Sequence, residues 1–207
     1  MKNMMLIIFF MYHTHMKSES GRKKALSHER IVSTAARAVR RHGFRDVGVA
    51  DVMKEAGLTH GGFYAHFASR DELLAQAVAQ ASKEIAVVIT THASALRKQG
   101  LSAFRAFIET YLSDGQIADR ENGCPVAALC GEFPNQAANV VDASRIAVGN
   151  LVMLVEDAMG NDAEVSDIWA VTAALIGAMQ LARALGDNDA GRAVLASARA
   201  SLLSRYK

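Results

Sequence analysis

The spacing of apolar residues is helical wherever the sequence is periodic, and this feature constrains the fold most. Ile31, Ala35 and Val39, for example, recur four positions apart, as one face of an α-helix requires. The Val, Ile and Thr alternation of a strand is absent, apart from a brief run over residues 87–91 inside a helical stretch. Because 51% of the 207 residues are apolar, the chain can bury a core. We therefore predict an all-α protein with about nine helices.

Capping residues and turn residues predict where these helices begin and end. The first is expected from about Ser27, an N-cap, to His42, which precedes Gly43. A capping box over residues 69–72 starts a long helix that ends near Leu96. The other helices are expected over about residues 49–56, 59–67, 102–112, 137–159, 165–185 and 190–205, with a short one from residue 125. We divide the chain into a disordered arm (1–24), a three-helix helix-turn-helix domain (25–72) and a helical domain (73–207).

Several classes of protein are excluded by what the sequence lacks. The two cysteines, Cys124 and Cys130, are too few for a disulfide framework and wrongly spaced for a zinc finger. The sequence has no Walker A loop, HExxH, GxSxG or dinucleotide-binding fingerprint. Its paired acids, at 156–157 and at 187 and 189, lie in solvated or loop contexts. We therefore expect no catalytic residues, no metal and no cofactor, and a protein that is not an enzyme.

Charge is divided unevenly along a chain whose net charge is only +2. Residues 17–70 hold 11 Lys and Arg against five Asp and Glu, together with four histidines. Residues 71–207 hold 11 basic against 16 acidic residues. A basic front and an acidic remainder suggest a nucleic-acid-binding end, although a chance distribution of solvated surface charge gives the same counts.

The first fifteen residues do not match the rest of the chain. Residues 4–11 read MMLIIFFM, which is far shorter than the roughly 20 residues that span a bilayer. No small-residue cleavage site follows, and Met16 opens a polar, basic stretch. We interpret Met16 as the true start of translation. A genuine hydrophobic tail, and with it a membrane-associated protein, is the alternative.

Residues 49–67, VADVMKEAGLTHGGFYAHF, contain two short helices joined at Gly57, a residue that accepts the left-handed conformation of such a turn. Phe63 and Phe67 lie one turn apart on the face that packs inward. The outward face is small and polar, and it consists of Thr59, His60, Gly61, Gly62, Tyr64 and His66. Two adjacent glycines cost a helix about 1 kcal/mol each relative to Ala. That cost is expected where the backbone must approach another molecule closely, as in the major groove of DNA; a plain helical hairpin with a polar face is the alternative.

Residues 43–74 resemble the N-terminal DNA-binding domain of the TetR/AcrR family of bacterial transcriptional regulators. The likeness covers about residues 31–78. The shared elements are Gly43-Phe44, Ala56-Gly57-Leu58-Thr59, Gly61, Phe63-Tyr64, His66-Phe67 and Asp71-Glu72-Leu73. Beyond this region we find only the general all-α pattern and an approximate likeness to members with a Gly-Cys-Pro segment.

The resemblance implies roles for individual residues. Thr59 would cap the recognition helix and bond a phosphate, and His60, Gly61 and Gly62 would face base edges. Tyr64, His66 and Arg70 would hold backbone phosphates; their donor groups suit this role, because phosphate contacts set the register of a protein on DNA. One departure is Val47-Gly48, which stands where family members usually have Ser or Thr and therefore brings no hydroxyl to the start of the second helix. Backbone N–H groups at that helix start could replace the missing contact.

The family also implies a homodimer, paired through the last two helices, and a small-molecule effector bound in the C-terminal domain. Residues 171–186 are apolar almost all round, as expected of an interfacial helix or of one buried within a single subunit. Polar or aromatic residues among apolar neighbours are the candidates for the effector pocket: His92, Phe104, Tyr111, Met153, Trp169 and Gln180. Each of them also fits an ordinary core or surface position.

Cys124 precedes Pro125 and is expected to be the N-cap of a short helix. The helix dipole would lower the pKa of its thiol and favour the thiolate. An oxidant or electrophile sensor is therefore an alternative to a small buried apolar side chain.

These observations predict a cytoplasmic, ligand-responsive regulator of transcription that binds double-stranded operator DNA as a homodimer. Repression of a palindromic operator, relieved when a small molecule binds, is the mode expected from the family. The alternatives are a redox or electrophile sensor that uses Cys124, an enzyme, and a membrane-associated helical protein.

Overall fold

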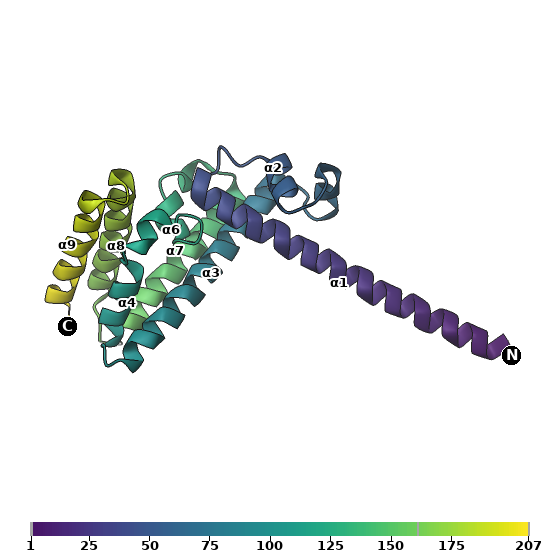
Figure 1. The fold of residues 1–207 in the computed structure, drawn as a ribbon, viewed down its shortest axis with the longest axis horizontal. Helices are drawn as coiled ribbons and strands as arrows, with labels where there is room; N and C mark the ends of the chain where they lie inside the picture. Colours follow the sequence, from purple (N-terminus) through teal and green to yellow (C-terminus); the bar gives the residue numbers. More distant parts are fainter. Residues whose placement is uncertain (1, 161, 207) are drawn as a thin grey trace.

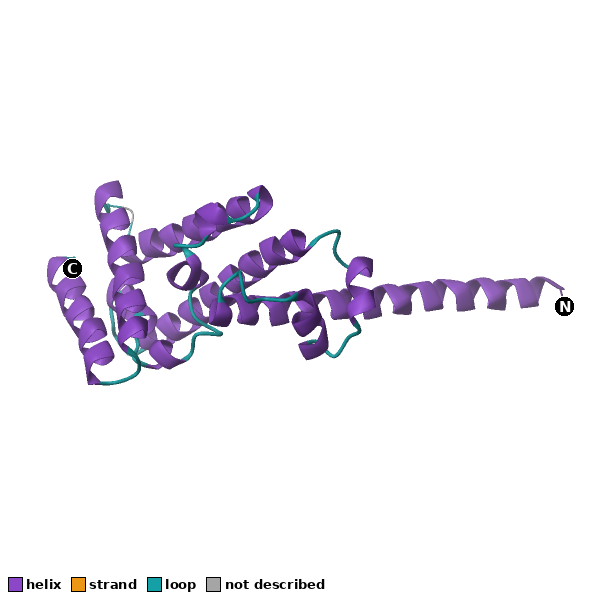
Figure 2. Cartoon of the chain, turned by 90° about the horizontal axis from the view of Figure 1, so that it is seen from above, coloured by secondary structure: helices purple, strands orange, loops and turns teal. Residues whose placement is uncertain are grey.

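A computed structural model describes residues 2–160 and 162–206, with the side chains of residues 21–160 and 162–206. In that part of the chain every regular element is a helix, joined by loops (Figure 2). The elements are α1 (Lys2–His42), α2 (Val49–Glu55), the 3-10 helix η1 (His60–Ala65), α3 (Arg70–Lys98), α4 (Ala103–Tyr111), α5 (Gly115–Ala118), α6 (Pro125–Leu129), the 3-10 helix η2 (Phe133–Asn135), α7 (Ala138–Met159), α8 (Val165–Leu185) and α9 (Asp189–Arg205). The all-α class is confirmed.

The first helix differs most from its predicted bounds. It begins at Lys2 rather than near Ser27, so Ser27 lies within a helix and is not an N-cap. The helix therefore continues through residues 2–24, which we expected to be a disordered arm, and its early turns extend away from the rest of the molecule (Figure 1). The apolar run over residues 4–11 lies outside the residues whose side chains are described. The start of translation at Met16 stays a prediction.

The N-terminal domain packs α2 and η1 against the second half of α1 and the start of α3. Its core contains Ile31, Ala35, Val39, Phe44 and Met53, each at most 1% exposed. Gly57, between α2 and η1, has φ 68°, and Gly43, after α1, has φ 79°. Both are left-handed conformations that glycine adopts without strain. The turn predicted at Gly57 is thus present.

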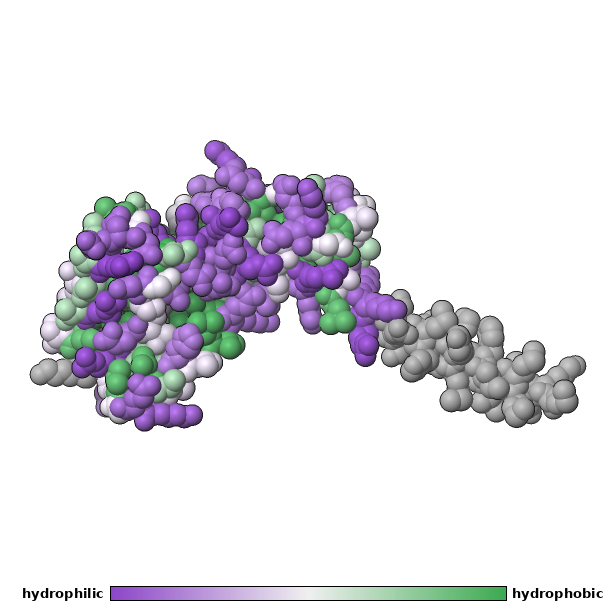
Figure 3. All heavy atoms as spheres, in the orientation of Figure 1, coloured by the Kyte–Doolittle hydropathy of each residue, from purple (hydrophilic) through white to green (hydrophobic). Residues whose placement is uncertain are grey.

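The C-terminal body surrounds α3 and α7, which pack along each other and carry buried apolar residues on their facing sides. Helices α8 and α9 pair at the end of the molecule opposite the start of α1 (Figure 1). By length and composition, α3, α7 and α8 could each cross a membrane. Here part of each helix is buried inside the body, and hydrophilic residues cover most of the face drawn in Figure 3, with apolar patches between them.

The start of α3 agrees with its predicted capping box, whereas the helix predicted over 59–67 differs from the observed one. Ser69 accepts a hydrogen bond from Glu72 N (3.1 Å) and the Glu72 carboxylate accepts one from Ala68 N (2.7 Å), which completes a capping arrangement at α3. The helix predicted over 59–67 is instead the six-residue 3-10 helix η1. Adjacent glycines explain the difference, because they weaken a regular α-helix. Helices α5 and η2 are too short for periodicity to predict.

Candidate nucleic-acid interface

One side of η1 is fixed to the N-terminal core by aromatic packing. Phe63 and Phe67 are each 2% exposed, and their rings stack with centroids 5.4 Å apart. The ring of His28, from α1, stacks on Phe67 at 4.6 Å. A short helix held by two buried rings has little freedom to rotate, so its opposite side has a defined direction.

That opposite side is open and contains the residues that the sequence singled out. Thr59, His60 and Gly61 are exposed, and the side chain of Tyr64 stands 74% exposed, edge-on to Phe63 (5.2 Å). A Cβ atom added at Gly61 would meet nothing within 4 Å. The protein's own packing therefore does not require glycine at 61, and the backbone of η1 is open to the outside at this position.

Thr59 and Gly62 differ slightly from their predicted roles. Thr59 occupies the N-cap position with extended backbone (φ −80°, ψ 147°), but its hydroxyl makes no capping hydrogen bond within the described chain. The predicted side-chain cap is therefore absent, and the hydroxyl remains available to a partner outside η1. Gly62 is half-buried, and a Cβ there would be 3.7 Å from the Thr59 hydroxyl and from Met53. An alanine would fit that space, whereas a larger side chain would have to displace one of these neighbours.

His66 follows η1 and is half-buried beside a second histidine. Its ring lies 5.9 Å from that of His28, and its buried Nδ1 has no hydrogen-bond partner among the described residues. Burial, together with the positive potential of His28 and Lys24, lowers the pKa of His66 below the ordinary 6.5. At neutral pH the ring is therefore uncharged, and it can donate one hydrogen bond rather than two.

Arg70 has a structural role that the sequence did not predict. Its Nε donates to the carbonyl of Val47 (3.2 Å) and its Nη2 donates to the carbonyl of Phe44. The guanidinium thus braces the loop between α1 and α2 from the first residue of α3. These two bonds use Nε and Nη2 but not Nη1, so the contact of Arg70 with phosphate stays a prediction beside this bracing role.

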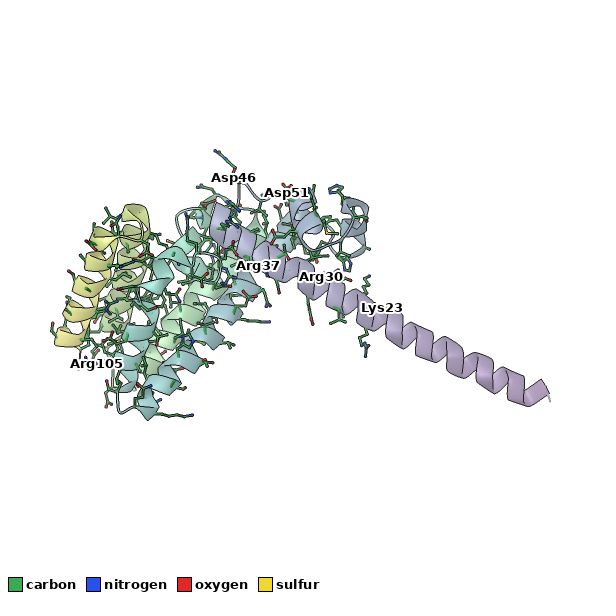
Figure 4. The ribbon with its side chains drawn as sticks, in the orientation of Figure 1. Lys23, Arg30, Arg37, Asp46, Asp51 and Arg105 are labelled. Carbon is green, nitrogen blue, oxygen red and sulfur yellow. The ribbon has the colours of Figure 1, made fainter. Side chains whose placement is uncertain are left out.

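Basic residues follow α1 beside this surface. Lys23, Arg30 and Arg37 are spaced seven residues apart along the helix (Figure 4), a spacing that keeps side chains near one face. Arg37 also forms an ion pair with Glu55 of α2 (3.4 Å). At the start of α2, by contrast, Gly48 is the N-cap and the Asp51 carboxylate lies close to it. An acid therefore occupies the helix start where backbone N–H groups were expected to receive a phosphate.

Residues 31–77, which contain this surface, match the family model described as bacterial regulatory proteins, tetR family. The N-terminal domain is thus similar to that of bacterial regulatory proteins of the tetR family. The match includes α2, η1 and the first turns of α3, which are the elements that position the exposed residues of the interface.

Relatives support this assignment. An HTH-type transcriptional regulator of Mycobacterium tuberculosis (strain H37Rv) is 31% identical over 105 residues, which are 50% of this chain and 52% of the relative. The chain thus spans about half the length of the curated relatives it matches. A TetR-family regulator from Agrobacterium tumefaciens has the same fold, with TM-score 0.68 and 23% identity over 89% of this chain and 99% of that one. A TetR regulator from Legionella pneumophila superposes with TM-score 0.70 and 17% identity over 86% and 96%. These proteins are regulators and not enzymes by name, in agreement with the sequence analysis.

The TetR-type domain is joined to the body by contacts that sequence reasoning missed. Arg40, whose side chain is fully buried, donates from Nη2 to Glu84 of α3 at 2.6 Å, and its Nε donates to Ala36 O at 3.0 Å. Glu132, between α6 and η2, accepts a hydrogen bond from Phe44 N (3.0 Å). It also fills the space beside Gly43, where a Cβ would overlap its carboxylate. The one available signal was the cation at position 40, next to the apolar stripe of the first helix.

The structure does not bring the predicted effector-pocket residues together. Tyr111 is buried at the end of α4, whereas His92, Met153, Trp169 and Gln180 are exposed, with Trp169 at 52%. Phe104 is buried against Tyr206, with ring centroids 6.1 Å apart. Of these residues, Tyr111 lines a small internal space, together with residues from α3, α5, α8 and the start of α6.

Cys124 occupies the predicted N-cap position, with Pro125 at the first position of α6. Its thiol is buried (5% exposed), and this burial raises its pKa above the ordinary 9.0. The expected lowering of the pKa by the helix dipole is therefore wrong, because desolvation of a thiolate outweighs the dipole of a five-residue helix. Cys130 is half-buried, and its sulfur accepts a hydrogen bond from Gln180 (3.2 Å).

A metal site is not formed by the side chains that the structure describes. In that part of the chain no group of three or more His, Cys, Asp or Glu residues could hold an ion. The acids predicted to be solvated, Glu156, Asp157, Asp187 and Asp189, are all exposed.

Proposed function

We propose that this TetR-family protein is a cytoplasmic transcriptional repressor that binds palindromic operator DNA as a homodimer and releases it when a small molecule binds the C-terminal body. The observation that carries this proposal is the outward side of η1. There, small and hydrogen-bonding residues stand uncovered on a helix that two buried rings hold in place. We propose no membrane partner and no cofactor for this function.

The open side of η1 fits the major groove of DNA. Exposed Gly61 would let the backbone approach the base edges, and His60 would supply the hydrogen-bonding group that reads them. Thr59, Tyr64 and the basic stripe along α1 would hold the phosphates on either side. Because phosphate contacts by cations release counterions, binding should weaken steeply with salt.

A homodimer is supported by the outer face of α8. Val165, Trp169, Leu181 and Leu185 are between 50% and 68% exposed, and with Ala173 and Gly177 they recur every four residues, so this apolar surface winds slowly around the helix. Exposed apolar surface that recurs along a helix is typical of an interface. A second copy of this chain is the expected partner, because a two-fold axis at this end would leave both η1 surfaces free.

Two copies of η1 on a two-fold dimer must meet DNA half-sites about 34 Å apart, or a multiple of that distance. A ligand releases DNA only if it binds more tightly to a dimer in which this spacing is wrong. Helix α3 is suited to transmit the change, because Arg70 at its start braces the N-terminal domain and Ile85 and Ile89 lie inside the body.

The decisive experiment measures binding of the full-length protein to a labelled DNA fragment from the neighbourhood of its own gene, at two salt concentrations. We expect binding that is sequence-specific and that falls as salt rises. The oligomeric state is measured in parallel for the wild type and for Leu181→Glu, which should dissociate the dimer and weaken DNA binding. An absence of specific binding to any such fragment would refute the proposal. A monomeric wild type would refute the dimer.

A further inference from the structure

A cluster of buried polar groups lies inside the C-terminal body, where α3, α4, α6 and α8 meet. Tyr111 comes from the end of α4, Cys124 from the start of α6 and Arg183 from α8. Ile85 and Ile89 of α3 and Met179 of α8 line the apolar side of the same space. The open volume is about 10 Å³, which is room for a single water molecule.

The guanidinium of Arg183 is fixed in this space by the backbone around it. Its Nε and Nη2 donate to the carbonyl of Gln116, at 3.3 Å and 3.0 Å. Gly123 is buried beside it, and a Cβ atom at that position would overlap Nη2 of the guanidinium. Position 123 therefore has to be glycine for the arginine to lie where it does.

Two donor groups in the cluster lack a strong acceptor. Nη1 of Arg183 is buried without a hydrogen-bond partner in the described chain, and the buried hydroxyl of Tyr111 has only the thiol of Cys124 as a neighbour to bond with. The charge of Asp119 acts on the guanidinium and raises its pKa, but burial lowers that pKa and is the larger cause. Arginine cannot accept a hydrogen bond, and the thiol of Cys124, which neighbours Tyr111, is a weak partner. Burial and this thiol raise the pKa of Tyr111, so its hydroxyl stays protonated at neutral pH and remains a donor.

A buried guanidinium N–H without an acceptor and a buried hydroxyl with only a thiol beside it are costly unless an acceptor with negative charge joins them. We propose that this space is the effector site of the protein, and that it binds the carboxylate of an amphipathic organic acid. One carboxylate oxygen accepts from Arg183 Nη1 and the other from Tyr111. The alkyl or aryl part of the acid packs against Ile85, Ile89 and Met179. The role as an effector site, though not the binding itself, rests on the function proposed above.

Occupation of this space has a direct route to the DNA-binding domain. The open volume is too small for a whole acid, so α3 and α8 must separate when one enters. Ile85 on α3 follows Glu84, the residue that binds the buried Arg40 of α1. A shift of α3 at Ile85 thus moves the ion pair that joins α3 to the helix carrying the basic stripe.

The test is a calorimetric titration of the full-length protein with octanoate, with its neutral counterpart octanamide, and with acetate. We expect octanoate to bind at least about 10-fold more tightly than octanamide, because hydrogen bonds to a charged acceptor are the stronger ones. Acetate should bind more weakly than octanoate, because it leaves the apolar side of the space unfilled. Equal affinity for acid and amide would overturn the proposal, and so would an absence of octanoate binding, which would leave only a bound water in the cluster.

Three variants locate the binding. Tyr111→Phe should weaken octanoate about 10-fold, and Arg183→Gln by more, since one or both carboxylate contacts are lost. Gly123→Ala keeps both polar groups but displaces the guanidinium, and it should weaken octanoate as well. The matched controls are Tyr206→Phe and Arg192→Gln. In the wild type, the hydroxyl of Tyr206 donates to Asp167 (3.1 Å) and Arg192 pairs with Asp187 on the surface (2.8 Å). Both controls should bind octanoate as the wild type does. Tyr111→Phe removes only a hydroxyl whose neighbour is a thiol, a weak partner, so a folded Tyr111→Phe protein with unchanged affinity would overturn the proposal.

DNA binding is measured separately, so that this site and the proposed function can fail independently. Octanoate that binds but leaves operator affinity unchanged would support the site and refute the ligand-released mechanism. Normal operator binding without any octanoate binding would support the DNA-binding surface and refute the site.

Discussion

The outward side of η1 and the cluster around Arg183 both present hydrogen-bonding groups without strong protein partners, but in opposite surroundings. At η1 the groups are exposed, as in Tyr64 at 74%, and water satisfies them until a ligand arrives. Around Arg183 the groups are buried, as in Tyr111 at 3%, and little water can reach them. The first arrangement costs the fold nothing, whereas the second costs about 1–3 kcal/mol for each group left without a partner.

This difference indicates how each region recognises its partner. A surface whose donors are already hydrated gains most from the charge of many phosphates, so its affinity depends on salt. An enclosed site gains by supplying a missing acceptor, so its affinity depends on matching a few atoms. Helix α3 and the Arg40–Glu84 pair connect the two regions.

The largest effect on stability is expected when the ion pair between Arg40 and Glu84 is removed. Glu84→Ala leaves the fully buried Arg40 without its anion, which should lower the free energy of unfolding by about 3 kcal/mol. The measurement is urea denaturation. Glu121→Ala is the control, since the Glu121 pair with Arg41 is surface-exposed (side chains 60% and 37% exposed) and should change stability by less than about 1 kcal/mol. Equal effects would show that the Arg40–Glu84 pair is not the buried pair described above.

A substitution on the exposed side of η1 should weaken operator binding without lowering the stability of the protein. Tyr64→Ala should reduce operator affinity about 10-fold on all sequences alike, because a phosphate contact is removed, while unfolding changes by less than about 1 kcal/mol. Arg70→Ala should instead destabilise the domain by about 1–2 kcal/mol, since the loop at residues 43–48 loses its brace. Fluorescence anisotropy and thermal denaturation separate the two outcomes. A stable Arg70→Ala protein with the binding defect of Tyr64→Ala would place Arg70 in the phosphate-contacting set.

The rates at which Cys124 and Cys130 react with a thiol reagent test whether the cluster around Arg183 is closed to solvent. Cys124 is buried with a raised pKa, whereas Cys130 is half-buried. In the native protein at pH 8, iodoacetamide should therefore modify Cys130 at least about 10-fold faster than Cys124, because both access and thiolate fraction are low at Cys124. Mass spectrometry of peptides at timed intervals gives both rates, with urea-denatured protein as the control. Faster modification of Cys124 would contradict a closed cluster and revive a thiol-based sensor.

The smallest effect concerns pH. Because the folded state lowers the pKa of His66 below 6.5, the unfolded state takes up a proton first as pH falls. This group therefore leaves stability unchanged above about pH 6.5 and lowers it as pH falls from 6.5 towards the folded pKa. His66→Gln should reduce this loss, measured by urea denaturation between pH 5 and 7.5, while His92→Gln at an exposed site of α3 should not. An identical pH dependence in wild type and His66→Gln would show that His66 is not buried as described.

Local sequence signals were sufficient for much of the fold. Ser69, Glu72 and Gly57 determine helix boundaries through short-range hydrogen bonds and backbone freedom, and the structure has these features where they were predicted. The outward residues of η1 were predictable for the same reason, since Phe63 and Phe67 define the inward side by their spacing alone. The start of α1 and the 3-10 geometry of η1 could not be predicted from the sequence. Each depends on a balance between helix propensities that a periodic pattern does not resolve.

What the sequence determined by itself is therefore the all-α class, the turn at Gly57 and the polar side of η1. What only the tertiary structure decided are the contacts between residues distant in the chain: Arg70 to the loop before α2, Arg40 to Glu84, and the cluster of Tyr111, Cys124 and Arg183. Arg183 is 72 positions beyond Tyr111, and no local pattern relates them. The pKa of Cys124 shows the physical reason. The sequence gives the helix dipole, which lowers it, but only the packed structure gives the desolvation that raises it.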